Sequence, residues 1–92
     1  MLERDIRKAL KERVEAYGGE IRAVSWLGRR HAPDVLCLLP TYHVFVETKA
    51  PGGEPNRGQL REHERMRAAG CIVAVISTLK QLDSWFWPEG LP

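Results

Sequence analysis

Apolar residues recur at helical spacing at the start of the chain, with charged residues between them. They are Leu2, Ile6, Leu10, Val14 and Tyr17. Steps of three or four residues place such side chains on one face of a helix, so the pattern predicts an amphipathic helix over residues 2–17. Gly18 and Gly19 follow, and glycine readily takes the left-handed conformation in which many helices end.

Four short apolar runs further along the chain predict β-strands. They cover residues 20–26, 35–39, 43–49 and 71–76. The second and fourth runs are almost entirely apolar, which is typical of strands that are covered on both faces. Pro40 and Thr41 separate the second run from the third and indicate a turn. We therefore expect these two strands to be antiparallel neighbours.

Two further helices complete the expected order of elements. Residues 57–69 form the first, with Asn56 as its N-cap and Gly70 at its end, and residues 79–86 form a short last helix. A crossover helix between the third and fourth strands favours a parallel pair. The sequence thus predicts an α/β fold in the order αβββαβα, with a mixed four-stranded sheet flanked by helices.

Composition narrows the class of protein only slightly. A chain of 92 residues has the length of one small domain, covering residues 1–92 and only marginally stable alone. Its net charge of +2 is compatible with nucleic-acid binding but does not require it. No apolar run approaches the roughly 20 residues that span a membrane, and residues 1–20 contain no signal-peptide core. We expect an intracellular, cytoplasmic protein with no membrane partner.

Charged residues stand where two of the predicted strands meet. Asp34 precedes the second strand, and Glu47 and Lys49 close the third. In an antiparallel pair the start of one strand lies beside the end of the other, so Asp34 and Glu47 should converge. Two carboxylates are suitable ligands for Mg²⁺ or Mn²⁺, and the main-chain carbonyl of Thr48 is a further candidate. The plainer interpretation is that these residues are solvated ends of strands.

Lys49 adds a second kind of chemistry to the same strand end. It shares a face of the strand with Glu47, two residues earlier. Its ammonium group could hold the attacking water, help to deprotonate it, and offset negative charge in the transition state of phosphodiester hydrolysis.

The ordered set of these residues resembles the PD-(D/E)xK nuclease superfamily and, more narrowly, its stand-alone, virus-type VRR-Nuc domains. The resemblance covers residues 1–80 and rests on the Pro33-Asp34 pair and the segment VFVETKAPGG. Further matching residues are Glu3, Gly28, Gln59 and Gly70. The resemblance implies a restriction-endonuclease-like αβββαβ core and metal-dependent cleavage of DNA. It also implies catalytic roles for Asp34, Glu47 and Lys49. Small viral members, including those of phages, are associated with resolving Holliday junctions as homodimers.

Three residues take a role from the resemblance, and each has a plainer alternative. Glu3 resembles the acid of the first helix that completes the family's metal site, but it could be an exposed acid favoured by the helix dipole. Gln59 resembles the glutamine that supports the catalytic strand, but it could be a polar residue on the helix surface. Gly28 would let the loop approach DNA closely, or it is a simple turn glycine. Thr48 departs from the most familiar motif spelling, which is harmless if its carbonyl contributes.

Two other segments are candidates for contacts with partners. Arg29, Arg30 and His31 directly precede the Pro33-Asp34 pair, where a DNA backbone near the metal would need cations, although a solvated basic loop is the alternative. The run Trp85-Phe86-Trp87 cannot face one small core with all its rings. At least one ring should be exposed or contact a partner, so a subunit interface and ordinary packing both stay open.

The main functional hypothesis is a structure-selective endodeoxyribonuclease that depends on Mg²⁺ or Mn²⁺, works as a homodimer and resolves Holliday junctions. One alternative keeps the chemistry but changes the substrate to a nicked, flap or single-stranded DNA. The other is a non-catalytic DNA-binding or assembly module on the same scaffold. Substrate choice would depend on dimer geometry and loops, which residue patterns do not specify.

Overall fold

The computed structural model describes residues 1–86, and these begin with helix α1 (Glu3–Ala16). The helix forms where the apolar spacing predicts it. Its fully buried side chains are Ile6, Leu10 and Val14. The chain leaves the helix through Gly18, whose φ of 80° lies in the left-handed region that favours glycine.

The four strands form one mixed sheet in the order β1-β2-β3-β4. They are β1 (Glu20–Ala23), β2 (Val35–Leu38), β3 (His43–Thr48) and β4 (Ile72–Ile76). β2 is antiparallel to both β1 and β3, whereas β3 and β4 are parallel. The predicted fold class, a mixed four-stranded sheet flanked by helices, is therefore confirmed, including both strand directions.

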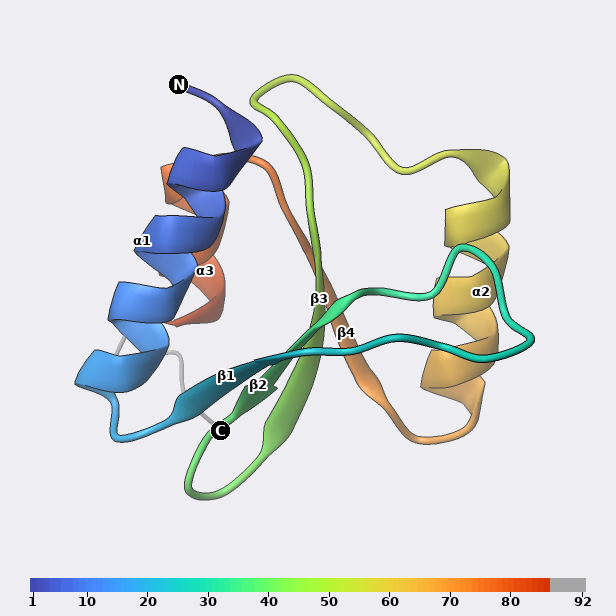
Figure 1. The fold of residues 1–92 in the computed structure, drawn as a ribbon, viewed down its shortest axis with the longest axis horizontal. Coiled ribbons are helices and arrows are strands. Elements are labelled where there is room, and N and C mark those ends of the chain that lie inside the picture. Colours follow the sequence, from blue (N-terminus) through green and yellow to red (C-terminus); the bar gives the residue numbers. More distant parts are fainter. Residues whose placement is uncertain (87–92) are drawn as a thin grey trace.

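Helices cover the two faces of the sheet unequally. Helix α1 packs beside α3 (Leu79–Trp85) on one face, and α2 (Arg57–Ala68) lies alone on the other (Figure 1). The apolar core fills the layer between the sheet and the α1–α3 pair, and includes residues from every strand except β1. The α2 layer is thinner, and its helix buries Glu62 and His63 as well as Met66.

The first strand is shorter than the predicted 20–26 and ends at Ala23. Beyond it, the Trp26 indole N–H donates a hydrogen bond to the Pro33 carbonyl at 2.6 Å. The same ring packs against Phe45, with the ring centroids 5.6 Å apart. Trp26 therefore connects the start of the β1–β2 loop to its end at Pro33 and packs both against β3.

Two residues of the aromatic run near the C-terminus, Trp85 and Phe86, lie within the described part of the chain. Phe86 is fully buried, and Trp85 is half-buried against the core. Trp87 lies outside the described residues, so whether one ring of the run contacts a partner stays untested. Among residues 1–86, no helix combines the length and the apolar character needed to cross a membrane.

Candidate active site

Two carboxylates lie at one edge of the sheet, where β2 begins and β3 ends. The register pairs Val35 with Val46, so the next position outward sets Asp34 opposite Glu47. The Asp34 carbonyl accepts a hydrogen bond from the Val24 N–H at 2.9 Å, which extends the β1–β2 pairing by one step. The structure thus brings together the two acids that the sequence analysis selected, and their action as metal ligands stays a prediction.

Glu47 is the most strongly perturbed acid of this edge. Its side chain is only 11 % exposed, and its Oε1 atom has no hydrogen-bond partner within residues 1–86. The pKa of Glu47 is raised to about 7, mainly by burial; the nearby Asp34 and Glu3 carboxylates contribute to the rise, and Lys49 and Arg7 oppose it. A buried carboxylate without donors costs free energy, and a bound cation would remove that cost.

His63 of α2 lies directly behind Glu47. It is fully buried, and its Nε2 atom is 3.6 Å from Glu47 Oε1, just beyond hydrogen-bonding range. Neither ring nitrogen has a partner within the described chain, and burial lowers the pKa of His63, assisted by Arg67. The imidazole is therefore neutral near pH 7. Sequence analysis assigned His63 no role, although its spacing from Met66 places both on the sheet-facing side of α2.

Arg7 of α1 connects the helix to the sheet edge. Its Nη2 atom lies 3.0 Å from Thr48 Oγ1 and 3.4 Å from Asp34 Oδ1. It also lies 3.5 Å from Glu3 Oε2, one helical turn earlier. Sequence analysis gave Arg7 no function, because the rotation of α1 about its axis decides which basic residue faces the acids. The only sequence signal is the i,i+4 spacing from Glu3.

The remaining candidates at this edge are Glu3, Thr48 and Lys49. Glu3 is about half exposed, and its carboxylate accepts a weak hydrogen bond from the Thr48 hydroxyl at 3.4 Å. The Lys49 main-chain N–H donates to the Ile76 carbonyl at 3.0 Å, which fixes this strand end against β4. These three residues share the edge with Asp34 and Glu47, and their assignment as ligands or catalyst stays a prediction.

Gln59 has a different environment from the one expected of a catalytic group. Its side-chain oxygen accepts a hydrogen bond from the main-chain N–H of Asn56 at 2.9 Å. The main-chain N–H of Gln59 in turn donates to the side-chain oxygen of Asn56 at 2.8 Å. This reciprocal pair is a capping box at the start of α2. The structure thus gives Gln59 a capping role, and its support of the catalytic strand stays a prediction.

The basic β1–β2 loop turns toward α2. Arg29 forms an ion pair with the buried Glu62 carboxylate, which also binds Arg65, and these partners lower the pKa of Glu62. His31 adopts a positive φ of 69° and lies against Gly58, where an added Cβ would come within 2.6 Å of its ring. Gly28, with φ of 73° and open space around it, is a turn glycine that also remains accessible to a partner.

The donors of this edge suit a hard divalent cation. Within residues 1–86, no three acidic, histidine or cysteine side chains are already arranged to enclose a metal ion. Two acids nevertheless lie opposite each other on neighbouring strands, and one of them holds a buried oxygen with no hydrogen-bond partner in the described part of the chain. Oxygen donors of this type, completed by water, are those that Mg²⁺ and Mn²⁺ prefer. The donor atoms of these residues are therefore of the type that such an ion binds, and its coordination shell would be completed on binding.

The strand order and the acids at this edge place the chain in the PD-(D/E)xK class of nuclease-like α/β proteins. Comparison with known proteins narrows the class. A solved structure described as a VRR_NUC domain is 45 % identical and superposes with a TM-score of 0.82, covering 90 % of this chain and 91 % of that one. "Putative nuclease p44" of Acyrthosiphon pisum secondary endosymbiont phage 1 is 43 % identical over 77 residues, which is 83 % of each chain. No model of a protein family matches. The chain belongs to the VRR-Nuc family.

Proposed function

We propose that this protein is an endodeoxyribonuclease that uses Mg²⁺ or Mn²⁺ to hydrolyse phosphodiesters, with residues 1–92 acting as one nuclease domain. The observation that carries the proposal is the buried Glu47 carboxylate, which lies opposite Asp34 at one sheet edge and whose Oε1 atom has no hydrogen-bond partner among residues 1–86. Folded proteins rarely keep a buried acid without a partner unless it has a function, because removing the carboxylate from water costs free energy. A cation that binds both acids accounts for this arrangement.

Each residue at the edge would have a distinct part in hydrolysis. Asp34 and Glu47 would hold the ion, with Glu3 and the Thr48 carbonyl as further ligands. When bound, the ion activates water and neutralises charge on the phosphate and the leaving oxygen. Lys49 would hold the attacking water and offset the developing negative charge. Overall, the water oxygen bonds to phosphorus, the bond from phosphorus to the leaving oxygen breaks, and a water proton ends on that oxygen.

The proposed substrate is branched DNA, in particular a Holliday junction, cut by a homodimer. One copy of the chain carries one candidate site, whereas resolution of a four-way junction needs two symmetric cuts. Two copies related by a two-fold axis would supply both sites. The name of the phage relative, which includes the word nuclease, and the VRR_NUC description of the similar structure support the chemistry rather than this particular substrate.

The test is cleavage of a synthetic four-way junction and a linear duplex of matched sequence, each with Mg²⁺, Mn²⁺ or EDTA. Wild type should make two symmetric nicks in the junction, cut the duplex little, and stop in EDTA. Glu47→Ala should be inactive, while the matched control Glu15→Ala, an exposed acid near the other end of α1, should cut normally. Equal cutting of the duplex would favour a nicking enzyme, and no cutting with either metal would favour a non-catalytic DNA-binding module.

A further inference from the structure

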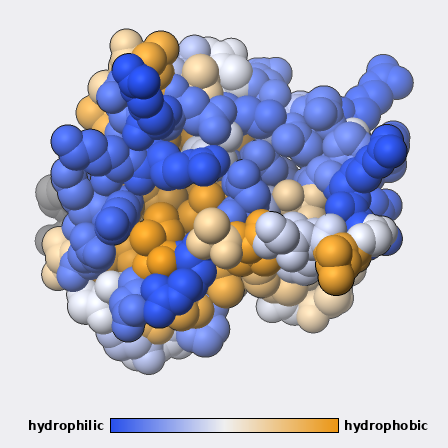
Figure 2. Space-filling model, in the orientation of Figure 1, coloured by the Kyte–Doolittle hydropathy of each residue, from blue (hydrophilic) through white to orange (hydrophobic). Residues whose placement is uncertain are grey.

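A groove of about 360 Å³ runs between α1 and β1, beside the candidate active site. Its floor is apolar and consists of Ile21, Ala23 and Val35. Figure 2 shows apolar atoms in this region, bordered by hydrophilic side chains. Nothing in the proposed hydrolysis uses the groove, although Val35 directly follows Asp34 in the chain.

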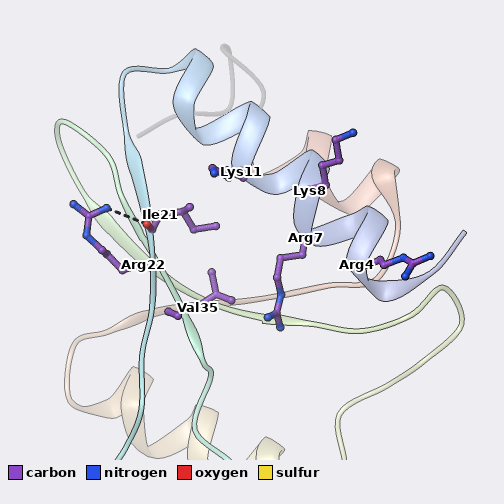
Figure 3. A pocket seen from close by; sticks show the side chains of 8 residues that line it. Arg4, Arg7, Lys8, Lys11, Ile21, Arg22 and Val35 are labelled. Atoms are coloured by element: carbon purple, nitrogen blue, oxygen red, sulfur yellow. Dashed lines mark hydrogen bonds between the residues drawn. The ribbon is translucent and has the colours of Figure 1, made fainter.

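The rim of the groove is strongly cationic. Five basic side chains line it, and they are Arg4, Arg7, Lys8, Lys11 and Arg22. Among the described residues that line the groove, none is acidic. Figure 3 shows Arg7 extending from α1 toward Val35, with Arg4 and Lys8 projecting outward from the helix. Exposed cations around an apolar floor indicate a partner that carries negative charge at its edges.

Arg7 joins the groove to the candidate active site. It lines the groove, and the same guanidinium lies 3.4 Å from Asp34 Oδ1 and 3.0 Å from Thr48 Oγ1. A chain of phosphates that presents one phosphodiester to Asp34 and Glu47 could therefore continue directly into the groove. The basic β1–β2 loop lies on the α2 side instead, where Arg29 is paired with Glu62, so it would serve a different part of the substrate.

The cations of α1 extend over a length comparable to that of several DNA phosphates. Arg4 and Lys11 are seven residues apart, which corresponds to about 10 Å along the helix axis. Phosphates of one strand advance about 3.4 Å each along the axis of a duplex, so a helix that lay along that axis would pass about three of them over this length. No aromatic ring is among the described residues that line the groove, so stacking of bases is not favoured there.

We infer that the α1–β1 groove binds the sugar–phosphate backbone of the DNA segment that flanks the scissile phosphodiester, without reading its sequence. This inference rests on the proposed nuclease function. A second copy of the chain is a poorer occupant, because a two-fold contact centred on the groove would bring its cationic rim against an identical one. A backbone, in contrast, presents phosphates to the rim and the less polar faces of its sugars to the floor.

The experiment measures how binding of a fluorescein-labelled DNA junction depends on salt, by anisotropy in EDTA so that no cleavage occurs. The variant Lys8→Ala/Lys11→Ala removes two exposed groove cations and leaves the active-site residues intact. The matched control Lys80→Glu changes the net charge by the same amount on the exposed face of α3. Circular dichroism and light scattering check that both variants fold and keep the wild-type oligomeric state.

Each phosphate contact on duplex DNA contributes about 0.9 to the slope of log affinity against log salt, so the double variant should lose about 1.8 from the wild-type slope. Between 50 and 200 mM salt, wild type should therefore lose about tenfold more affinity than the double variant, while Lys80→Glu should follow wild type. An unchanged slope in the double variant, an equal loss in the control, or a changed oligomeric state would each overturn the inference.

The groove inference and the nuclease proposal can each be wrong without the other, and the measurements distinguish the two cases. Glu47→Ala, assayed in parallel, should lose cleavage and keep the wild-type salt slope. If wild type cleaves DNA but the double variant keeps the full slope, the groove inference is wrong and the nuclease proposal stands. If wild type shows the groove-dependent slope but cleaves nothing with Mg²⁺ or Mn²⁺, the nuclease proposal is wrong and the groove still binds a DNA backbone.

Discussion

Glu47→Gln should make the metal-free protein more stable at pH 8, although it removes a predicted catalytic group. In wild type, burial and the neighbouring acids raise the pKa of Glu47 to about 7. Folding must therefore place a charge where a neutral carboxyl is preferred. Glutamine has nearly the same shape and carries no charge, so the substitution removes this cost while preserving the packing against His63.

The size of the effect follows from the pKa. A rise from 4.5, the usual value, to about 7 corresponds to about 3 kcal/mol, at about 1.4 kcal/mol for each pH unit. The glutamine amide also has to be buried with incomplete hydrogen bonding, which returns part of that gain. We expect a net stabilisation of about 1 to 2 kcal/mol at pH 8, equivalent to a Tm increase of about 5 °C or more for a domain of this size.

The sign of the pH dependence is equally specific. Below pH 4.5 the carboxyl is protonated in both the folded and the unfolded state, so the two proteins should be similarly stable. Between pH 4.5 and 7 the unfolded chain has lost this proton while the folded wild type still holds it, so wild-type stability falls across this window and levels off above about pH 7, whereas Glu47→Gln does not titrate. Urea unfolding in EDTA at pH 4.5, 6 and 8 would measure this divergence.

Glu62→Gln is the matched control for this experiment. Glu62 is also buried, but its pKa is lowered by the hydrogen bond from Arg29, so its charged form is stabilised in the fold. The same chemical change should therefore destabilise the protein at pH 8 and do less at low pH. If Glu47→Gln were destabilising at pH 8, or if its effect did not grow between pH 4.5 and 8, the account of Glu47 as an uncompensated acid would be refuted.

Three further predictions concern the same site. Lys49→Ala should abolish cleavage of the junction while leaving DNA affinity in EDTA unchanged, and unchanged turnover would remove Lys49 from the mechanism. Because a proton competes for Glu47 below its pKa of about 7, Mn²⁺ affinity should fall up to about tenfold per pH unit from pH 7 to 5, and calorimetry showing a flat profile would contradict this. His63→Leu should fold normally but weaken Mn²⁺ binding by about tenfold, because residues packed behind a metal ligand help to fix its orientation and so contribute to metal affinity. Wild-type affinity in His63→Leu would show that the imidazole only fills space.

The convergence of Asp34 and Glu47 could be predicted because it depends on strand direction and register alone. A short turn at Pro40 makes two strands antiparallel, and the register then follows from the apolar pattern. The position of Arg7 and His63 could not be predicted in this way. It depends on how far each helix is rotated against the sheet, and a thin apolar stripe such as that of α2 leaves this rotation open.

Local competition explains the contacts of Gln59 and the early end of the first strand. Gln59 stands three residues after Asn56, and this spacing suits a capping box as well as a catalytic support, so the nearby main chain binds its side chain. The first strand ends early because Trp26 gains a hydrogen bond and an aromatic neighbour by leaving the ladder. Both outcomes depend on contacts that a residue pattern does not encode.

The central claim is that Asp34 and Glu47 together bind a divalent cation, and titration calorimetry with Mn²⁺ in the absence of DNA tests it most directly. Wild type at pH 8 should bind Mn²⁺, Asp34→Ala should bind at least tenfold more weakly, and the exposed control Glu15→Ala should bind like wild type. Equal Mn²⁺ affinity in wild type and Asp34→Ala would show that these acids do not form a metal site.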